Sequence, residues 1–420
     1  MSTKDPEGML SPFRVLDLAD EKGFFCGKLL ADLGANVIKV EKPGGDPARS
    51  IGPFYKDTPD PEKSLFWFAY NAGKRGITLD IEAPAGRDLF RKLLGSADFL
   101  IESFAPGYME KLGLGYQSLS EINKGIIMVS ITPFGQTGPY KNYKATDIIC
   151  WALGGTSYIS GDPHRAPVRT SHVPQSYLHG SSDGAIGAML ALFNRGLAGE
   201  GQHVDVSIQE SMERVAYPAH INWDLNKRVI QRIGSALRIP PHGVRTRTVY
   251  PCKDGAINFY LFGGKTGARW NPALLEWMAS EGMATEFLRD IDWEQFDYAK
   301  TSQEDVDRIE GAIIDFFMTH TKAEISQEGF RRRIPLGPVA TAQDIIEDEQ
   351  LISRGYWVEV EHPELGISIT YPGPFIKGSE AFPKIRRRAP LIGEHNQEIY
   401  EQELGLSEDE TAALNRIGVI

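Results

Sequence analysis

Apolar and polar residues alternate along the first half of the chain in a pattern that predicts strands joined by helices. Residues 13–18 and 36–41 are short apolar runs typical of buried strands, and residues 23–33 between them carry apolar side chains at helical spacing. Gly34 follows this helix directly and is the residue type that most often ends a helix. A strand, a helix and a strand in this order predict a βαβ unit, and therefore a parallel sheet covered by helices.

The same pattern continues beyond this first unit. Further apolar runs suited to strands occur at 76–80, 98–102, 126–131 and 203–207, and helical spacing occurs at 83–94 and 177–195. The order of these elements predicts an α/β fold of the doubly wound type. In such folds, ligands bind at loops that follow the carboxyl ends of the strands.

The pattern changes character twice in the second half of the chain. A basic connector occupies residues 227–247, a smaller α+β region follows to about residue 333, and Pro335-Leu-Gly-Pro338 interrupts any regular element. Two strand-like runs, 357–360 and 367–370, come after it. These changes predict three segments: 1–222, a connector with a small domain at 223–335, and a C-terminal part at 336–420.

Composition narrows the class of protein. At 420 residues the chain is too long for a single small module, and 41% hydrophobic residues are enough for a large core. The net charge of −11 disfavours nucleic acid as a partner, because binding to phosphate backbones needs a basic surface. Cys26, Cys150 and Cys252 have no zinc-type spacing, so we expect no metal site and three buried thiols. Without an apolar run long enough to span a membrane, we expect a cytoplasmic protein.

Several motifs in one order and spacing make the chain resemble the class III (CaiB/BaiF) CoA-transferases over nearly its whole length. The motifs are Leu30-Ala-Asp-Leu-Gly-Ala-Asn-Val-Ile-Lys-Val-Glu41, Gly44-Gly-Asp-Pro-Ala-Arg49, Glu102-Ser-Phe-Ala-Pro-Gly107, Gly135-Gln-Thr-Gly-Pro139, Gly199-Glu-Gly-Gln202, Ile334-Pro-Leu-Gly-Pro-Val339 and Arg388-Ala-Pro-Leu-Ile-Gly-Glu-His395.

The resemblance implies a particular architecture and chemistry. It implies a large Rossmann-like domain for CoA, built from segments 1–222 and 336–420, a small middle domain, and two chains interlocked as a dimer. It also implies that coenzyme A, as acyl-CoA, is a substrate, and that no cofactor is permanently bound.

The family motifs point to five residues as the CoA site. CoA carries phosphates and an adenine, so its site needs cations and an aromatic or apolar face. By position in the motifs these residues are Lys42, Lys74, Arg75, Phe104 and Lys111. Taken singly, a lysine in a loop is more often a solvated charge. Family members often have asparagine and arginine where this chain has Ser103 and Ala105, which removes two contacts from the same loop.

A glycine loop is a further candidate for the active site. Gly263 and Gly264 lie in Leu261-Phe-Gly-Gly-Lys-Thr-Gly267, where family enzymes have a glycine loop beside the reacting groups. Glycines allow backbone N–H groups to approach an acyl oxygen closely. An ordinary turn after the strand-like run 256–261 explains the same residues almost as well.

Tyr177 occupies the position of the family's catalytic aspartate. Counting back from Ala191-Leu192 and Arg195 reaches Tyr177, and Pro174 has the spacing of the family's proline before the aspartate. The family mechanism needs a carboxylate that forms a mixed anhydride with the acyl group and then an enzyme-CoA thioester. A phenol with a pKa near ~10 cannot do this.

Other acidic residues do not replace this aspartate by position. Asp183 is six residues further on, which in a helix places it on the opposite face, so it is only a weak alternative carboxylate. Asp147 and Asp162 are further candidate carboxylates without positional support. The family's racemase branch needs a histidine where this chain has Thr146, so we exclude racemase chemistry.

Three functions remain open after this reading. The preferred one is a subunit of a heteromeric CoA-transferase (EC 2.8.3 class) in which a homologous partner supplies the aspartate. By the resemblance it moves CoA from an acyl-CoA donor such as succinyl-CoA to a carboxylic acid such as benzylsuccinate in anaerobic aromatic degradation. The alternatives are an active homodimer that uses a displaced carboxylate, and a non-catalytic CoA-binding scaffold.

Overall fold

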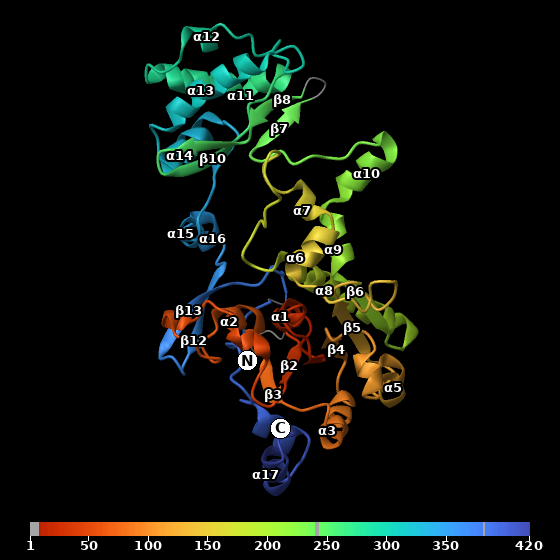
Figure 1. The fold of residues 1–420 in the computed structure, drawn as a ribbon. Helices are drawn as coiled ribbons and strands as arrows, with labels where there is room; N and C mark the ends of the chain where they lie inside the picture. The colour runs from red at the N-terminus through yellow and green to blue at the C-terminus, as the bar shows by residue number, and fades with distance from the viewer. Residues whose placement is uncertain (1–7, 240–242, 381–382) are drawn as a thin grey trace. The chain divides into compact units, whose positions relative to one another are not determined.

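The computed structural model describes residues 8–239, 243–380 and 383–420. It separates into two compact units, coloured by position along the chain in Figure 1. Unit 1 comprises the described residues within 1–157, 171–221 and 349–420, and unit 2 comprises those within 158–170 and 222–348. Each unit has its own hydrophobic core, so each is described by itself.

Unit 1 is built on a six-stranded sheet with the order β3-β2-β1-β4-β5-β6, and every neighbouring pair in it is parallel. The strands are β1 (Arg14–Asp17), β2 (Asn36–Glu41), β3 (Arg75–Thr78), β4 (Phe99–Glu102), β5 (Ile127–Thr132) and β6 (His203–Ser207). Each of these strands coincides closely with an apolar run that we expected to be a strand. The predicted α/β fold with a parallel central sheet is therefore confirmed.

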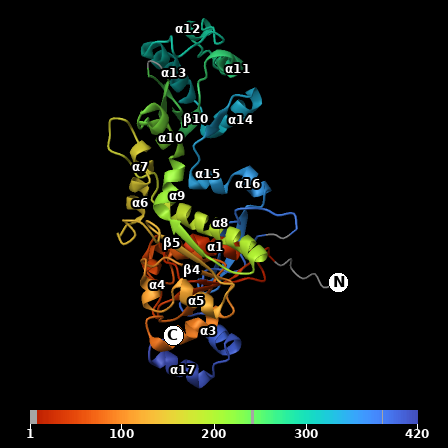
Figure 2. The same ribbon diagram turned by 90° about the vertical axis from the view of Figure 1, so that its right-hand side faces the viewer.

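Helices cover both faces of this sheet because successive strand residues point in opposite directions. On one face, α1 (Phe24–Asp32) and α8 (Gln175–Ala198) pack with Val15 and Val129 in one core cluster. On the other face, α3 (Pro84–Leu94) and α5 (Tyr116–Ile122) pack with Leu16 and Met128 in a second cluster. Figure 2 shows α8 lying beside α1, and α8 packs against β5 and β6.

Gly34 ends α1 as expected. It follows the last helical turn with φ +106°, a conformation that side chains other than glycine rarely adopt. A Cβ atom at this position would also lie 2.6 Å from the Cα of Gly8. The tight turn brings the chain directly into β2, so Gly34 sets the spacing of the first βαβ unit.

The C-terminal segment packs on the N-terminal strands of the same unit. The Tyr400 hydroxyl donates to the Thr78 carbonyl oxygen over 2.6 Å, and Ile399, Val419 and Ile420 are buried in the second core cluster. The carbonyl oxygen of Pro390 accepts from both Arg49 and Trp67.

Unit 2 has an α+β core of its own. A three-stranded antiparallel sheet contains β9 (Val249–Cys252), β10 (Gly255–Phe259) and β11 (Leu336–Pro338), and it packs with α11 (Gly264–Ser280), α13 (Gln303–Phe317) and α14 (Lys322–Arg332). The unit extends to residue 348, further than the expected segment end at 335, because β11 pairs with β10. It also includes residues 158–170, which no local pattern assigns to it.

The remaining elements are short or connect these cores. They are α2 (Leu65–Asn71), α4 (Tyr108–Lys111), α6 (Asp147–Leu153), α7 (Thr156–Ile159), α9 (Ile208–Val215), α10 (Tyr217–Asn226), α12 (Glu286–Arg289), α15 (Ala342–Ile346), α16 (Glu349–Ser353), α17 (Glu408–Arg416), the single turns η1 (Pro47–Ser50) and η2 (Tyr55–Asp57), the π-helix η3 (Glu398–Glu403), and the two hairpins β7 (Ala236–Ile239) with β8 (Val244–Arg247) and β12 (Trp357–His362) with β13 (Ile367–Pro372).

The described residues bear on the expectations about cysteines, metal ligands and membrane spans. The three cysteines are buried free thiols, as predicted. Within the described ranges, no cluster of three or more His, Cys, Asp or Glu side chains is arranged to hold a metal ion, and no helix is both long and apolar enough to cross a membrane.

Candidate active site

The carboxyl edge of the parallel sheet has a switch point between β1 and β4. Chain order runs outward from β1 to β2 and β3 on one side, and from β4 to β5 and β6 on the other. The loops that follow β1 and β4 therefore leave in opposite directions and open a crevice between them, which is where ligands bind in folds of this type. The residues of these two loops and of the nearby start of α8 make up the candidate site.

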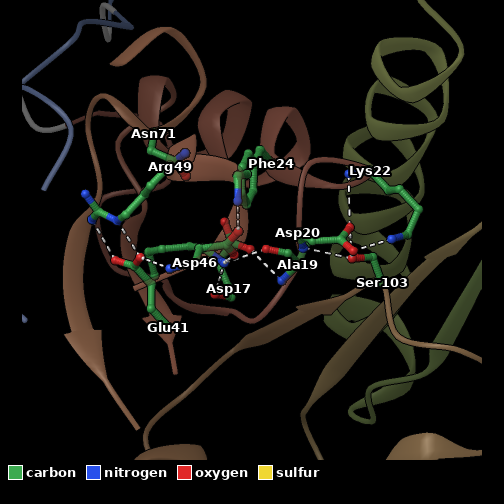
Figure 3. Close-up of polar contacts among 12 residues, drawn as sticks. Asp17, Ala19, Asp20, Lys22, Phe24, Glu41, Asp46, Arg49, Asn71 and Ser103 are labelled. Atoms are coloured by element: carbon green, nitrogen blue, oxygen red, sulfur yellow. Dashed lines mark hydrogen bonds and ion pairs between the residues drawn. The ribbon is translucent and has the colours of Figure 1, made fainter. Parts of the chain in front are cut away.

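Ser103 and Asp20 tie the two loops together. The Ser103 hydroxyl donates to Asp20 Oδ1 over 2.7 Å and accepts the backbone N–H of Asp20 over 2.9 Å. Figure 3 shows this pair together with Lys22, whose ammonium forms an ion pair with the same carboxylate. On the opposite wall, the Ser181 hydroxyl of α8 donates to the Lys22 carbonyl oxygen over 2.9 Å. Three elements therefore meet around residues 20–22.

Tyr177 lies in the first turn of α8, next to this meeting point. The preceding residue, Ser176, donates both its backbone N–H and its hydroxyl to Asp147 Oδ1, over 2.9 and 2.7 Å. Asp147 is the first residue of α6 and is itself buried. The two helix starts are thus joined by hydrogen bonds, and this junction fixes where the Tyr177 ring lies.

The surroundings of Tyr177 keep its phenol protonated. Its side chain is only 7% exposed, and burial raises the pKa of the hydroxyl well above its ordinary value. The negative charges of Glu21, Asp20 and Asp147 act in the same direction. A phenolate nucleophile is therefore disfavoured here even more than in water.

Asp183 is engaged elsewhere. Its carboxylate forms an ion pair with Arg214 of α9. It faces a groove of about 600 Å³ that is lined by α8, β6 and α9. This partner, together with the helical offset from Tyr177, leaves Asp183 without support as a replacement nucleophile.

Lys42 and Phe104 are brought to one surface at the carboxyl edge. Lys42 follows β2, is exposed, and pairs with Glu82 over 2.9 Å. Glu82 also accepts the Tyr108 hydroxyl over 2.6 Å, and the Tyr108 ring packs on Phe104 with 4.6 Å between centroids. Lys111 lies exposed at the end of the same short helix, α4. An exposed cation beside an aromatic pair has the composition that a nucleotide phosphate and base require.

Lys74 is different, because protein oxygens surround its ammonium completely. It donates to Asp17 Oδ2 over 2.7 Å, and to the Phe24 carbonyl oxygen and Asn71 Oδ1 over 2.9 Å each. The side chain is fully buried, and burial lowers its pKa. Figure 3 labels Asp17, Phe24 and Asn71, the three residues whose oxygen atoms accept these bonds. Lys74 has no donor left to offer a phosphate.

Arg75 lies at the opposite, amino edge of the sheet. It is the first residue of β3, and its guanidinium binds Asn36 Oδ1, Glu398 and Glu403. The arrangement argues against both Arg75 and Lys74 as CoA ligands. It leaves Lys42, Phe104 and Lys111 as the candidates for that role.

Gly263 and Gly264 lie in unit 2, where they start α11. Gly264 has φ +59°, and its N–H donates to the Phe296 carbonyl oxygen over 2.8 Å. A Cβ on Gly263 would lie 2.7 Å from the same oxygen. Both glycines are thus required by the backbone path of this turn, whatever further role the loop has.

Sequence reasoning overlooked residues 20–22. They directly follow the first predicted strand, and in a doubly wound sheet the loop after that strand adjoins the switch point. The strand order was therefore the signal that pointed to Asp20, Glu21 and Lys22 as site residues. Burial raises the pKa of the Glu21 carboxyl, which is half-buried and electrostatically close to Tyr177.

Comparisons with known proteins agree with this architecture. The family model CoA-transferase family III matches residues 10–396. The chain is 36% identical to the succinyl-CoA:(R)-benzylsuccinate CoA-transferase subunit BbsE of Thauera aromatica, over 98% of both chains. It is 31% identical to the succinyl-CoA–L-malate CoA-transferase beta subunit of Chloroflexus aurantiacus, again over 98% of both.

A solved structure has the same fold. The crystal structure of a CaiB/BaiF family protein from Brucella suis superposes with a TM-score of 0.81 and 28% identity, covering 94% of this chain and 99% of the other. The family match extends over both units and almost the full length. The chain therefore belongs to CoA-transferase family III, the CaiB/BaiF family.

Proposed function

We propose that this chain is a subunit of a heteromeric class III CoA-transferase, and that a homologous partner chain supplies the catalytic aspartate. The complex moves CoA from an acyl-CoA donor, such as succinyl-CoA, to a carboxylic acid acceptor, such as benzylsuccinate. The observation that carries the proposal is the buried phenol of Tyr177 at the nucleophile position that the family motifs indicate.

The chemistry of the reaction supports a partner. A carboxylate can attack the donor thioester, release CoA thiolate and become a mixed anhydride, and the thiolate can then displace the free acid to leave an enzyme-CoA thioester. The second step, in which the thiolate attacks, uses the carbonyl carbon of the enzyme's own carboxyl group. Tyrosine has no such carbon, so an aryl ester at Tyr177 would end the sequence after acylation.

The relatives support the same reading. Two of them are described as subunits, one of a benzylsuccinate and one of a malate CoA-transferase. Both align with this chain over almost their full length, so each named subunit corresponds to a chain of this size and architecture. We infer that the present chain also acts within an assembly of homologous subunits.

The surface around Lys42, Phe104 and Lys111 is the CoA site in this proposal. Lys42 and its partner Glu82 are both exposed to solvent. An ion pair of this type contributes little to the stability of the fold, so either partner can readily pair with another ion. A CoA phosphate can therefore replace Glu82 at small cost. Phe104 and Tyr108 provide the flat surface against which an adenine ring or the pantetheine arm packs.

Co-expression tests this function. The chain produced alone is expected to show no CoA transfer, and co-expression with a paralogue that has aspartate at the position of Tyr177 is expected to give transfer between an acyl-CoA and a dicarboxylic acid. Transfer by the chain alone at the rate of the complex would contradict the proposal. Binding of CoA without transfer in every combination would instead favour a non-catalytic scaffold.

One observation favours the alternative of an active homodimer. Glu21 is a half-buried carboxyl close to Tyr177, and burial raises its pKa. If this chain uses a displaced carboxylate, Glu21 is better placed than Asp183, which pairs with Arg214. In that case Glu21→Gln, and not Asp183→Asn, would abolish transfer by the isolated chain.

A further inference from the structure

A buried carboxyl group lies directly under the loop that carries Phe104. Glu102 is the last residue of β4, is only 3% exposed, and accepts the backbone N–H of Phe104 over 2.7 Å through Oε2. This bond closes the first turn of the loop 103–107. On the other side, the loop is held by the Ser103–Asp20 pair. The position of Phe104 therefore depends on Glu102.

Glu102 is connected to the surface through two neighbouring strands. In the register of the sheet it lies opposite Ser130 of β5, whose hydroxyl binds the Glu102 carboxyl. The same hydroxyl lies 2.8 Å from Nε2 of His203, the first residue of β6. His203 is exposed, and its ring stacks on Tyr116 of α5 with 5.6 Å between centroids. The chain of contacts runs from a buried acid through a hydroxyl to an imidazole at the surface.

We propose that Glu102, Ser130 and His203 form a proton relay across three strands, and that this relay makes the position of the loop 103–107, and with it the affinity for CoA, depend on pH. That the loop contacts CoA rests on the proposed function; the relay itself does not.

The relay takes up one proton from solvent and passes it inward. With Glu102 ionised and His203 neutral, Ser130 donates to the Glu102 carboxylate and accepts Nε2–H from His203. When solvent protonates Nδ1 of His203, the Nε2 proton moves to the Ser130 oxygen and the Ser130 proton moves to Glu102. Glu102 is then neutral, Ser130 is again a hydroxyl that now donates to Nε2, and His203 is again neutral with its proton on Nδ1, so the three groups have gained one proton and lost one negative charge.

The surroundings of these groups favour titration of the Glu102 carboxyl near neutral pH. Burial raises the pKa of Glu102 to about 7, and Glu110 of α4 and Asp20 add to the effect, while the bonds from Ser130 and Phe104 oppose it. Burial lowers the pKa of His203, which Asp205 and Glu110 partly counteract. Ionised Glu102 accepts the Phe104 N–H as a charge-assisted bond, which is stronger than the bond to a neutral acid. The loop is thus held more firmly above the transition than below it.

Hydrogen exchange followed by mass spectrometry tests the relay without any ligand. After correction for the intrinsic rate, protection of the peptide containing Phe104 is expected to rise several-fold between pH 6 and pH 8 in the unmodified chain. Glu102→Gln is expected to remove this pH dependence. Ser130→Ala is expected to move the midpoint to higher pH, because the ionised carboxylate loses a donor. Glu110→Gln, on the exposed side of α4, is the control and is expected to keep a transition at slightly lower pH.

Titration with CoA separates the relay from the proposed function. Affinity is expected to rise with the same midpoint as the protection, and to become independent of pH in Glu102→Gln. Protection that does not change with pH, or that still changes in Glu102→Gln, would overturn the relay. If protection depends on pH as predicted but the chain does not bind CoA, the relay stands and the proposed CoA site is contradicted instead.

Discussion

The proposed function depends on Tyr177, whose phenol is buried and has a raised pKa. Removing only its hydroxyl leaves the ring and its packing in place and takes away about one hydrogen bond, worth roughly 0.5–1.5 kcal/mol. In the co-expressed complex, Tyr177→Phe is therefore expected to leave the turnover rate within a few-fold. Changing the partner's aspartate to alanine is expected to abolish turnover, as measured by steady-state CoA transfer.

A large loss of turnover in Tyr177→Phe would contradict this prediction. If Tyr177→Phe reduced turnover as much as loss of the partner's aspartate, the hydroxyl itself would have to take part in the reaction. The buried setting of Tyr177 gives no physical basis for such a loss.

Lys42 and Lys74 provide a matched pair of variants at the residue scale. Lys42→Ala removes an exposed cation, so it is expected to weaken CoA binding several-fold with an unchanged melting temperature. Lys74→Met leaves the buried Asp17 carboxylate without its cation, which is expected to cost about 3–5 kcal/mol of folding free energy. Calorimetric titration with CoA measures the affinity of each variant, and urea unfolding measures its folding free energy. Weaker CoA binding by a fully folded Lys74→Met variant would restore Lys74 as a ligand.

The sequence predicts the positions of some site residues and not of others, for physical reasons. Position in a motif was enough to place Tyr177 at the start of a helix and Lys42 at the carboxyl edge of the sheet. It did not show that Lys74 and Arg75 are engaged, because their partners Asp17, Glu398 and Glu403 lie far away in sequence. Spatial pairing of this kind leaves no trace in the local pattern.

The junction between α6 and α8 controls the position of Tyr177 at the scale of elements. Ser176→Ala removes the hydroxyl that binds Asp147 inside the protein and is expected to destabilise unit 1 by about 1–3 kcal/mol. Ser182→Ala on the same helix is the control, since the Ser182 hydroxyl bonds back to the Leu178 carbonyl oxygen of its own helix and the loss of such a bond costs little. Urea unfolding monitored by tryptophan fluorescence compares the two. Equal stability of both variants would contradict the role given to this junction.

The elements of unit 1 were predictable because its strands are buried on both faces and its helices are amphipathic or rich in small residues. The first helix, the first two strands and β6 lie where the periodicity places them. Unit 2 was harder, since its sheet includes β11, which is separated from its neighbour β10 by four helices. Pairing over such a distance depends on tertiary packing, and hydrophobic spacing along the chain does not report it.

A pH-dependent stability follows from Glu102 at the scale of its strand. The folded state raises the pKa of this carboxyl to about 7 from an ordinary value of 4.5. The stabilisation that the neutral acid provides is therefore complete at low pH and is lost as the pH rises through 7. Glu102→Gln stays neutral, so its melting temperature is expected to exceed that of the unmodified chain at pH 8 by more than at pH 5.5. A difference that is independent of pH in differential scanning calorimetry would show that Glu102 does not titrate in this range.

At the scale of the whole molecule, α8 presents an apolar stripe that the single chain leaves uncovered. Ile186, Leu190, Phe193 and Leu197 are 58–75% exposed and lie on one side of the helix. An exposed apolar face of this kind marks an interface. We expect a homologous chain to cover it, in line with the interlocked assembly that the family resemblance implies and with the relatives described as subunits.

Paired variants test this interface. Phe193→Asp is expected to weaken association strongly, because it buries a charge in an apolar contact. Phe330→Asp, which changes a side chain that is 90% exposed in unit 2, is the control and is expected to have no effect. Size-exclusion chromatography with light scattering reads the outcome. A folded monomer of 46.6 kDa for the unmodified chain at micromolar concentration would rule out obligate association.

The most direct measurement is to locate the acylated residue in the working complex. Incubation with an acyl-CoA, trapping with hydroxylamine and peptide mass spectrometry identify the carboxyl group that has become a hydroxamate. We predict a hydroxamate on the partner's aspartate in the co-expressed complex, and none on this chain whether alone or in the complex. A hydroxamate on any carboxyl group of this chain, with Glu21 the first to inspect, would contradict the claim that the partner supplies the nucleophile.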